Sequence, residues 1–516
     1  MNSRKRFTIA WLVFLGYFAV GATTIGLTYL ALPQPGEQDG FYLAAKWIAC
    51  GDLADYRQTF QHDWGPLYPW MLAAIGRIVG STHLAGKFLT LFFGSLLVAL
   101  TYLAGETIFG SRRIAGTAVA LLALNPIYLY YATLASTDIS AACFIFLGIY
   151  LAILAARSEN RWPPALLAGL ACGAACLIRY QAFAPGLGLL IASAFLPAPK
   201  KRPREVFAAA FVLGLILPPA IAGLTGLSTP GDFGGLSQIK WKLIEGLAEV
   251  SGGSNALRSL FPGYARSLLL LGWILGFVPY LALIGLRRIP RSLAADQRVV
   301  LLLGLTPLIA YFVGVGWYPP PGQPEIRRLF LLFLPPFSLA LAAAAQGRTA
   351  SEKAKTLRHR LPLVLTLGWA VVFFLLEFPY FDLPGGRPWQ RWLGLSGVYV
   401  QREYPPGEAA ALDAARDWIR RAQPGCAPVV TNSPATTVLF PNAVFIGYGV
   451  DLTDETLNTL IRQRQRKPGY VMQTEVQGQN HLEPGPLAGG VTLEQLTESP
   501  GGIFYRLIPA EATVTP

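Results

Sequence analysis

Long apolar runs recur along most of this 516-residue sequence, and they limit what the chain can fold into. Hydrophobic residues make up 53% of the chain and charged residues only 14%. A soluble chain needs more polar surface than this. A helix that crosses the hydrocarbon core of a membrane needs about 20 apolar residues. The sequence therefore predicts an α-helical polytopic membrane protein with eleven spans, at residues 7–31, 83–108, 113–132, 138–157, 163–179, 181–197, 205–227, 265–286, 299–317, 327–346 and 361–381.

The distribution of basic residues supports this count and sets the orientation. Basic residues that flank membrane spans favour the cytoplasmic side. If the N-terminus lies inside, every strongly basic short loop falls on the inner side, at residues 4–6, 112–113, 157–161, 200–204, 287–298 and 348–360. The net charge of +13 is then explained by membrane orientation, which argues against nucleic-acid binding. The run at 7–32 is too long for a cleaved signal peptide, so we interpret it as an uncleaved first span.

An odd number of spans places the C-terminal part of the chain on the outer side. In residues 400–516, helical patterns at 408–422 and 453–466 alternate with strand patterns at 428–431, 443–446, 469–472 and 502–507. Alternating helices and strands predict a small extracytoplasmic α/β domain. A linker at 382–399 is expected to join it to a transmembrane domain at 1–381, whose long outer loops are 32–82 and 228–264. The expected location is a bacterial inner (plasma) membrane.

Five cysteines are scattered along the chain without a CxxC pair, so no metal knuckle or disulfide framework is predicted. Cys143, Cys172 and Cys176 lie in predicted spans and are expected to be buried thiols. Only Cys50 and Cys426 are expected to face outside. A long-range disulfide between them is the less favoured alternative to two free thiols.

Acidic residues at the outer ends of the spans are the first candidates for chemistry. Asp39 follows the first span within the sequence Glu37-Gln38-Asp39, and Asp138 begins the fourth span. Ionisable groups close to the hydrocarbon are costly and tend to be functional. A helix-capping role is the alternative for both Asp39 and Asp138. Asp63 is a third outer acid, for which a structural role is favoured.

Several arginines face outside against the positive-inside tendency. Arg179 ends the fifth span, and Arg327 with Arg328 opens the tenth. A guanidinium group can bind two phosphate oxygens at once, which suits the phosphate of a lipid carrier. Snorkelling to the interface is the alternative reading of these arginines. Lys240 could assist, although an amphipathic surface helix explains it equally well.

Outer carboxylates together with phosphate-binding cations suggest one type of reaction. A carboxylate deprotonates an acceptor hydroxyl or amine, which attacks the anomeric carbon of a sugar. Cations, with or without a divalent metal, stabilise the departing lipid phosphate. Nucleotide sugars are confined to the cytoplasm. This chemistry therefore suits an enzyme that acts outside the cytoplasm and uses a lipid-linked donor.

The same motifs resemble those of the polytopic GT-C glycosyltransferases that use polyprenyl-phosphate sugars. These include the aminoarabinose transferase of lipid A and the protein O-mannosyltransferases. The resemblance covers roughly residues 1–346. It rests on the order and sidedness of several short motifs, namely Asp39-Gly40-Phe41-Tyr42, Gly65-Pro66-Leu67-Tyr68-Pro69-Trp70, Thr137-Asp138, Leu177-Ile178-Arg179 and Arg327-Arg328-Leu329-Phe330.

The resemblance implies roles for individual residues. Asp39 would be the catalytic base, and Asp138 would assist it or help to hold a divalent metal cation. Arg179, Arg327 and Arg328 would bind the carrier phosphate. Glu37, Tyr42, Asp63 and Tyr68 are further candidates. The donor would be a polyprenyl-phosphate sugar, and the acceptor a lipid, a glycan or a protein.

The chain departs from the family pattern at three places. Gln38 stands where many relatives have a second acid, Arg327-Arg328 replaces Arg-Tyr, and Gly65 stands where a second proline is common. Metal dependence therefore stays open. A transporter or flippase of lipid-linked sugars, a polymerase or ligase of lipid-linked glycans, and a non-enzymatic scaffold are the alternatives.

Overall fold

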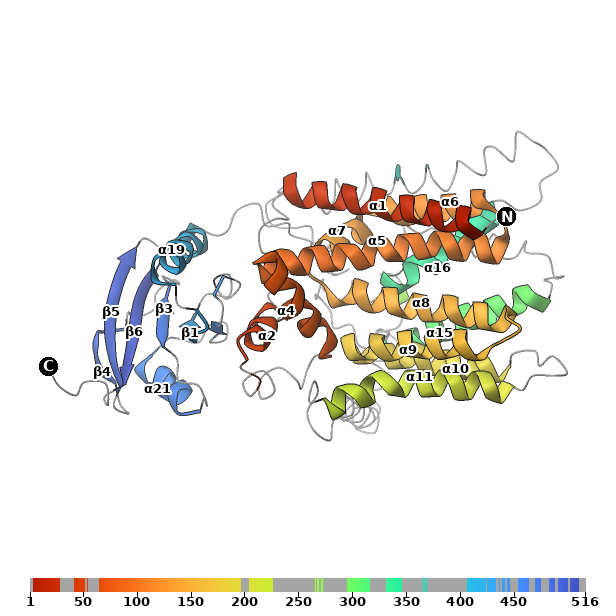
Figure 1. Ribbon diagram of the computed structural model, residues 1–516. Helices are drawn as coiled ribbons and strands as arrows, with labels where there is room; N and C mark the ends of the chain where they lie inside the picture. Colours follow the sequence, from red (N-terminus) through yellow and green to blue (C-terminus); the bar gives the residue numbers. More distant parts are fainter. Residues whose placement is uncertain are drawn as a thin grey trace. The chain divides into compact units, whose positions relative to one another are not determined.

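Helices form most of the chain, and a six-stranded sheet lies in its C-terminal part (Figure 1). The structure is a computed structural model. It describes residues 3–27, 41–51, 53, 65–195, 204–225, 265, 267–268, 271, 295–315, 331–345, 364, 367–368, 406–423, 425–432, 436, 439–440, 443–445, 453–463, 469–474, 482–487, 491–499 and 502–509.

Helices occur at nine of the eleven predicted spans, and the other two, 265–286 and 361–381, lie almost entirely outside the described residues. The predicted class, a helical polytopic membrane protein with a small sheet near its C-terminus, is confirmed. The helices before the sheet are α1 (Ser3–Leu27), α2 (Phe41–Ala49), α4 (Leu67–Val79), α5 (Thr82–Phe109), α6 (Arg112–Ala123), α7 (Pro126–Thr133), α8 (Thr137–Arg157), α9 (Trp162–Ile178), η2 (Tyr180–Ala182), α10 (Phe183–Ala194), α11 (Arg204–Leu224), α15 (Ala295–Val315) and α16 (Leu334–Ala345).

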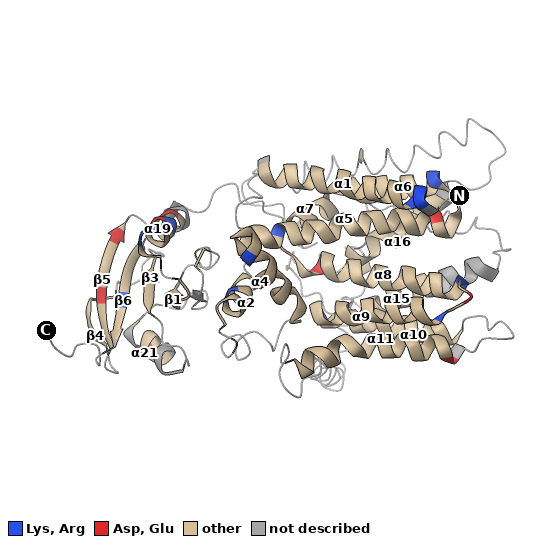
Figure 2. Cartoon of the chain, viewed as in Figure 1, with Lys and Arg blue, Asp and Glu red and all other residues tan. Residues whose placement is uncertain are grey.

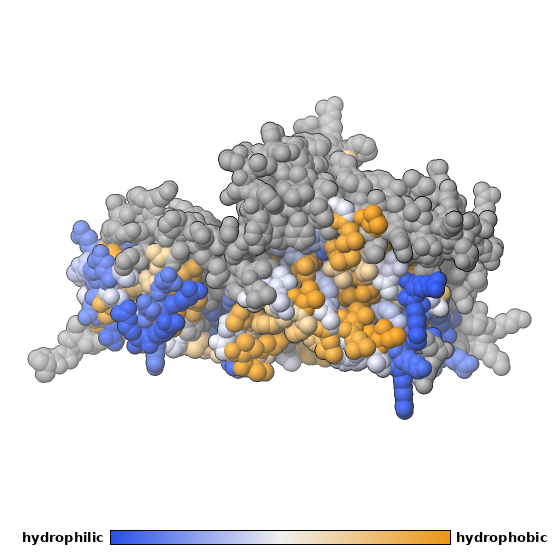
Figure 3. All heavy atoms as spheres, turned by 90° about the horizontal axis from the view of Figure 1, so that it is seen from above, coloured by the Kyte–Doolittle hydropathy of each residue, from blue (hydrophilic) through white to orange (hydrophobic). Residues whose placement is uncertain are grey.

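Among the described residues, four helices are long and apolar enough to cross a membrane, or five if one bent pair is a single span. Two of the four, α1 and α11, leave large apolar side chains on their surface, such as Trp11 at 60% and Ile216 at 57% exposure. Apolar atoms also cover much of the helical region on the face in Figure 3. An apolar surface of this extent suits contact with lipid tails.

The predicted span at 113–132 is not one continuous helix. It consists of α6 and α7, which meet at an angle of 66°. Asn125 ends the first helix and caps the second, because its side chain accepts a hydrogen bond from the backbone N–H of Tyr128 at 3.0 Å. Pro126 follows at the first helical position, where its missing N–H costs nothing. A cap followed by a proline therefore starts a new helix inside an apolar run.

Glycines allow two of the helices to pack closely. α9 packs against α8 on one side and α11 on the other. A Cβ atom at Gly169 would collide with the backbone of α11 at Phe211, and one at Gly214 would collide with the backbone of α9 at Leu166. Small residues that let backbones approach are typical of helix contacts within membranes. This packing fixes the end of α9, where Arg179 follows.

Basic residues gather at one end of the helices, around a buried acid (Figure 2). The Glu106 carboxylate lies 3.7 Å from the guanidinium groups of both Arg6 and Arg112. Arg157, at the end of α8, donates a hydrogen bond of 2.6 Å to the carbonyl of Thr107. Three segments predicted to be inner therefore lie at one end of the helices. Asp138 lies at the opposite end of α8.

The C-terminal part is a mixed sheet with strand order β2-β1-β3-β6-β5-β4. β1 pairs in parallel with β2 and β3, whereas β3, β6, β5 and β4 pair antiparallel in that order. The elements are α19 (Pro406–Ala422), β1 (Val429–Thr431), β2 (Ala443–Phe445), α21 (Asp454–Gln463), β3 (Tyr470–Gln473), β4 (Gly485–Leu487), β5 (Val491–Ser499) and β6 (Gly502–Pro509).

Each face of this sheet buries its own apolar cluster, because neighbouring strand residues point to opposite faces. On one face, Val430, Val471 and Tyr505 pack with Leu457 of α21. On the other face, the α19 residue Trp418 stacks on Phe504 with ring centroids 5.0 Å apart. We call this second group the α19 cluster, and its buried members are Ala411, Ala414, Ala415, Trp418, Val429, Phe440, Met472 and Phe504.

The predicted α/β pattern of the C-terminal part is confirmed for both helices and four of the strands. Thr453 caps α21, since its hydroxyl accepts a hydrogen bond from the Thr456 N–H at 3.3 Å. Strands β4 and β5 were not predicted. β5 carries Glu494, Gln495 and Glu498 among its apolar residues, and its pairing with β6 rather than its own composition fixes it as a strand.

By internal contacts the chain divides into two compact units, and one of them combines distant segments of the sequence. The first unit comprises residues 1–28, 63–67 and 87–399. The second unit comprises residues 29–62, 68–86 and 400–516. The predicted outer loop 228–264 and linker 382–399 lie outside the described residues. The domain boundaries drawn from the sequence stay predictions.

A disulfide closes the second unit. It joins Cys50, directly after α2, to Cys426, which precedes β1, across 376 positions of sequence. Cys143, Cys172 and Cys176 are free and buried, as predicted. The expectation of free thiols at Cys50 and Cys426 is wrong, because the fold brings their Cα atoms to 5.6 Å, a usual separation for a disulfide.

The buried Tyr505 in β6 allows the stability of the sheet to be tested. Its hydroxyl donates a hydrogen bond of 2.8 Å to the carbonyl of Leu482. Burial, reinforced by the charge of Glu498, raises the pKa of Tyr505 from 10 to about 12. The folded state thus favours the neutral phenol, whose stabilising effect is full below pH 10 and lost as the pH rises through 12.

We expect Tyr505→Phe to destabilise the protein by about 1 kcal/mol near neutral pH. The deficit relative to the parent protein should shrink above pH 10, where the phenol of the unfolded parent chain loses its proton while the folded protein still holds it. Thermal unfolding of both proteins in detergent, at pH 8 and at the highest pH that keeps them folded, measures this. An unchanged deficit at both values would contradict the prediction.

Candidate functional site at the start of α8 and the end of α9

The buried carboxylate of Asp138 is held at the start of α8. Ser136 is the N-cap of this helix, and its hydroxyl accepts a hydrogen bond from the Asp138 N–H at 3.2 Å. The same hydroxyl donates to the Asp138 carboxylate oxygen Oδ2 at 3.1 Å. The alternative that Asp138 itself caps the helix is therefore wrong. Its charge still gains from the helix dipole in the first turn.

Arg179 forms a bidentate ion pair with Asp138. Its Nε lies 3.0 Å from Oδ1 of Asp138, and its Nη2 donates to Oδ2 at 3.1 Å. Nε also lies 2.9 Å from the hydroxyl of Thr137. Asp138 and Arg179 are only 5% and 7% exposed. A buried pair of this kind fixes the plane of the guanidinium, and loss of either partner leaves an uncompensated charge.

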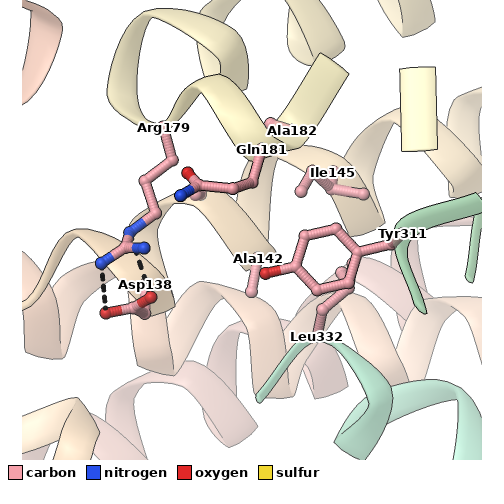
Figure 4. A pocket seen from close by; sticks show the side chains of 9 residues that line it. Asp138, Ala142, Ile145, Arg179, Gln181, Ala182, Tyr311 and Leu332 are labelled. Carbon is pink, nitrogen blue, oxygen red and sulfur yellow. Dashed lines mark hydrogen bonds and ion pairs between the residues drawn. The ribbon is translucent and has the colours of Figure 1, made fainter. Parts of the chain in front are cut away.

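A small pocket opens beside this ion pair (Figure 4). The polar side chains that line it are those of Asp138, Arg179, Gln181 and Tyr311. They come from α8, the end of α9, η2 and α15. Apolar walls complete the pocket, contributed by Ala141, Ala142, Ile145, Ala182 and Leu332. A few convergent polar groups in an apolar hollow are typical of ligand sites.

The Gly-Pro motif of the first loop packs against the backbone that precedes Arg179. A Cβ atom at Gly65 would collide with the carbonyl oxygen of Leu177 and the carbonyl carbon of Ile178. Only glycine fits here without a shift of the chain. The motif that departs from the family pattern thus supports the end of α9, where Arg179 begins.

Replacement of Gly65 by alanine should displace the end of α9 and with it Arg179. Because the contact atoms belong to the backbone, the chain cannot yield by a side-chain rotation. We expect the activity of the purified protein to fall roughly 10- to 100-fold, the effect of a misplacement near 1 Å.

A matched control is Gly116→Ala in α6, where an added Cβ meets nothing within 4 Å. This variant should transfer like the parent protein. Equal activity of the Gly65 variant and the Gly116 variant would argue against the supporting role of Gly65.

Two predicted tyrosines lie in the second unit. Tyr68 is fully buried, its ring contacts Phe41 with centroids 5.4 Å apart, and its hydroxyl donates to the carbonyl of Gly86 at 3.4 Å. The Tyr42 ring contacts His83 at 5.4 Å. Both tyrosines therefore help to pack α2 against α4 and α5. Asp39, Glu37, Asp63, Lys240, Arg327 and Arg328 lie outside the described residues, and their roles stay predictions.

Sequence reasoning missed two residues of the site, Tyr311 and Gln181, which line the pocket. A tyrosine inside an apolar run gives no distinctive signal, because most such tyrosines only pack. In the second unit, Lys46 of α2 was not singled out either, although it is 5% exposed. Burial lowers the pKa of Lys46 well below its ordinary value.

The contacts of Asp138 do not suit a metal ion. Both of its oxygens face the guanidinium of Arg179, and one also accepts from Ser136. A cation there would lie against a fixed positive charge. Within the described part of the chain, no group of three potential ligands gathers around a common point. The role of Asp39 in metal binding, together with Asp138, stays a prediction.

Comparisons with known proteins agree with the motifs. Residues 63–221 match the family model described as dolichyl-phosphate-mannose-protein mannosyltransferase. This segment contains Gly65, Asp138 and Arg179, the residues that form and support the site. A search of the curated proteins found no match.

Two of the solved structures that are similar to the chain are described as follows. ArnT from Cupriavidus metallidurans, bound to undecaprenyl phosphate, is 13% identical, with 98% of each chain covered and a TM-score of 0.47. The oligosaccharyltransferase of Archaeoglobus fulgidus is 13% identical, with 89% of this chain and 68% of that chain covered and a TM-score of 0.48.

The family model covers residues 63–221, and over this segment it agrees with the resemblance to glycosyltransferases that the sequence motifs indicated.

Proposed function

We propose that this enzyme moves a sugar from a polyprenyl-phosphate carrier to an acceptor on the extracytoplasmic side of a bacterial inner membrane. The observation that carries the proposal is the buried ion pair of Asp138 and Arg179, which lies beside a pocket at the start of α8. It lies within the segment that matches the mannosyltransferase family. The acceptor is a lipid, a glycan or a protein.

In this proposal Arg179 binds the phosphate of the carrier. A guanidinium fork suits phosphate oxygens, and the end of a span is where a lipid phosphate lies. Asp138 and Thr137 hold Arg179 in a fixed plane through its Nε and Nη2 atoms. We assign Asp138 a positioning role rather than that of a base, because both of its oxygens face the arginine. Arg327, Arg328 and Lys240 are proposed to add positive charge around the phosphate.

The first-loop carboxylate of Asp39 is proposed as the general base. It would take the proton from an acceptor hydroxyl or amine as that group attacks the anomeric carbon. The bond from this carbon to the phosphate oxygen breaks, and its electron pair stays on the departing polyprenyl phosphate. The arginines stabilise the negative charge that develops there. No step is assigned to a metal ion.

The Cys50–Cys426 disulfide supports the extracytoplasmic side. Disulfides persist in oxidising compartments and are rare in the cytosol. Cys50 lies in the first predicted outer loop and Cys426 in the C-terminal part, so both would be outside if the N-terminus is inside. Labelling of an added C-terminal tag from outside intact spheroplasts tests the side.

The donor class is tested with the purified protein in nanodiscs. A polyprenyl-phosphate sugar and the corresponding nucleotide sugar are offered in parallel, with an extract of envelope lipids and glycans as acceptor. We expect transfer only from the lipid-linked donor, with release of polyprenyl phosphate. Transfer from the nucleotide sugar, or movement of the intact lipid-linked sugar across the bilayer without cleavage, would contradict the proposal.

A further inference from the structure

We infer that the C-terminal domain is a positioning element for the first outer loop, which it holds through α2, and that the Cys50–Cys426 disulfide locks α2 in place. This inference rests on the proposed function, in which the first loop supplies the catalytic base. It gives the C-terminal domain a task in catalysis.

The first observation is that α2 packs with the C-terminal domain. Leu43, in the middle of α2, lies against the α19 cluster, which contains Trp418 and Phe504. α2 also contacts β2. The first outer loop thus contributes to the apolar core of a domain that begins more than 350 positions later in the sequence.

The second observation is that two interactions, a disulfide and a hydrogen bond, hold the C-terminal end of α2. The disulfide at Cys50 follows directly after the last residue of the helix, Ala49. The carbonyl of Ala49 accepts a hydrogen bond of 2.7 Å from Nη2 of Arg77 in α4. The N-terminal end is held by the contact of Phe41 with Tyr68, also in α4. A short helix of nine residues is marginal alone and is fixed by such contacts.

The third observation concerns the edge of the sheet where an α/β domain usually binds ligands. This is the crevice between the carboxyl ends of neighbouring parallel strands whose connections diverge. In this sheet the crevice lies after β1 and β3. Oδ1 of Asn432 accepts hydrogen bonds from the N–H and the hydroxyl of Thr474, at 2.9 and 2.8 Å. The Asn432 amide donates to the Thr474 carbonyl at 3.3 Å. Among the described residues, these hydrogen bonds hold β1 and β3 together at this edge.

The held helix is close in sequence to the proposed base. Asp39 precedes Phe41, the first residue of α2, by two residues. Under the proposed function, motion of α2 would therefore change the position of the base.

The test uses the full-length protein with its disulfide intact, reduced or removed. A phosphine reductant supplies two electrons, two protons come from water, and the phosphine becomes its oxide as Cys50 and Cys426 return to thiols. Loss of the disulfide-linked tryptic peptides that contain residues 47–57 and 422–462 confirms the reduction by mass spectrometry. Oxidised glutathione then restores the bond by accepting the same two electrons.

We expect reduction to lower kcat for transfer by about 10- to 100-fold, the effect of a small misplacement of a catalytic group. The KM for the lipid-linked donor should change little, and reoxidation should restore kcat. Cys50→Ser, Cys426→Ser and the double variant should show the same loss, because they remove the same bond. Cys172→Ala removes a buried free cysteine elsewhere and should keep the parent kcat.

A second readout needs no substrate. Lys46 in α2 is 5% exposed, so an amine-acetylating reagent should not modify it in the oxidised protein. After reduction we expect acetylation of Lys46, measured by peptide mass spectrometry. Full kcat together with protection of Lys46 in the reduced protein would overturn the inference. If the cysteine variants do not fold, reduction of the folded parent protein decides the question.

The two proposals can fail separately. If the oxidised protein transfers no sugar from a lipid-linked donor, the proposed function fails, whereas protection of Lys46 still reports whether the disulfide holds α2. If the oxidised and reduced proteins transfer equally well, the proposed function stands and the positioning role of the C-terminal domain is wrong.

Discussion

Replacing Asp138 by asparagine is expected to abolish measurable sugar transfer and to destabilise the protein by about 3–5 kcal/mol. Asparagine keeps the size of the side chain but removes its charge. The guanidinium of Arg179, 7% exposed, then lacks the carboxylate that its Nε and Nη2 contact. Arg179→Gln should have a similar effect, because it leaves the carboxylate unpaired. Thermal unfolding in detergent and the transfer assay measure both effects.

The double variant separates stability from catalysis. When both charges of a buried pair are removed, much of the lost stability should return. We therefore expect Asp138→Asn with Arg179→Gln to unfold nearer to the parent protein than either single variant. Its transfer should stay at least about 1000-fold below the parent protein, the scale of a lost charge-stabilising group. If the double variant recovered transfer as well as stability, the ion pair would have only a structural role.

Glu106, a buried acid with two partly exposed arginine partners at the other end of the helices, provides a control. Glu106 lies 3.7 Å from Arg6 and from Arg112, and its side chain is 4% exposed. Glu106→Gln should also destabilise the protein, since it leaves two arginines near an uncharged group. At temperatures where it is folded, however, its transfer should stay close to that of the parent protein. If Glu106→Gln lost as much transfer activity as Asp138→Asn, both losses would be explained by impaired folding.

The other large effect is expected at Asp39. We expect Asp39→Asn to lower transfer by about 100- to 10,000-fold, because an amide cannot take the proton of the acceptor. Binding of the lipid-linked donor should be retained, since in our proposal the carrier phosphate is bound by Arg179 and the other cations. Transfer rate and donor binding, both measured in nanodiscs, test the two halves of this prediction.

Two neighbouring acids are the controls for Asp39. Glu37→Gln and Asp63→Asn make the same chemical change in the same loop. If Asp39 is the base, both variants should keep transfer within about tenfold of the parent protein, well short of the loss of a general base. A loss at Glu37→Gln that matches or exceeds the loss at Asp39→Asn would move the role to Glu37.

The helices could be predicted well because a membrane span is defined by composition alone. An apolar run of sufficient length between basic loops determines a helix, whatever its neighbours are. The bend at Asn125 was missed because a cap and a proline inside an apolar run do not change its hydropathy. β5 was missed for the opposite reason. Its Glu and Gln residues are poor strand formers, and its pairing with β6 determines its structure.

The site was predicted only in part. Asp138 and Arg179 were both selected because charges at the ends of spans are rare and costly. Their direct pairing could not be predicted, since it depends on how α8 packs against α9. The role of Gly65 could not be predicted for the same reason, because it depends on the close approach of Gly65 to the backbone of α9. Contacts between distant segments are set by the fold, and a single sequence does not display them.

The separation of the two bridged cysteines has a consequence for the synthesis of the protein. Cys50 leaves the ribosome 376 residues ahead of its partner. At a synthesis rate of about 5–20 residues per second, it waits roughly 20–75 s before Cys426 exists. The other three cysteines are buried in helices. Throughout that interval the first loop cannot be closed by its disulfide, because closure has to wait until Cys426 has been synthesised.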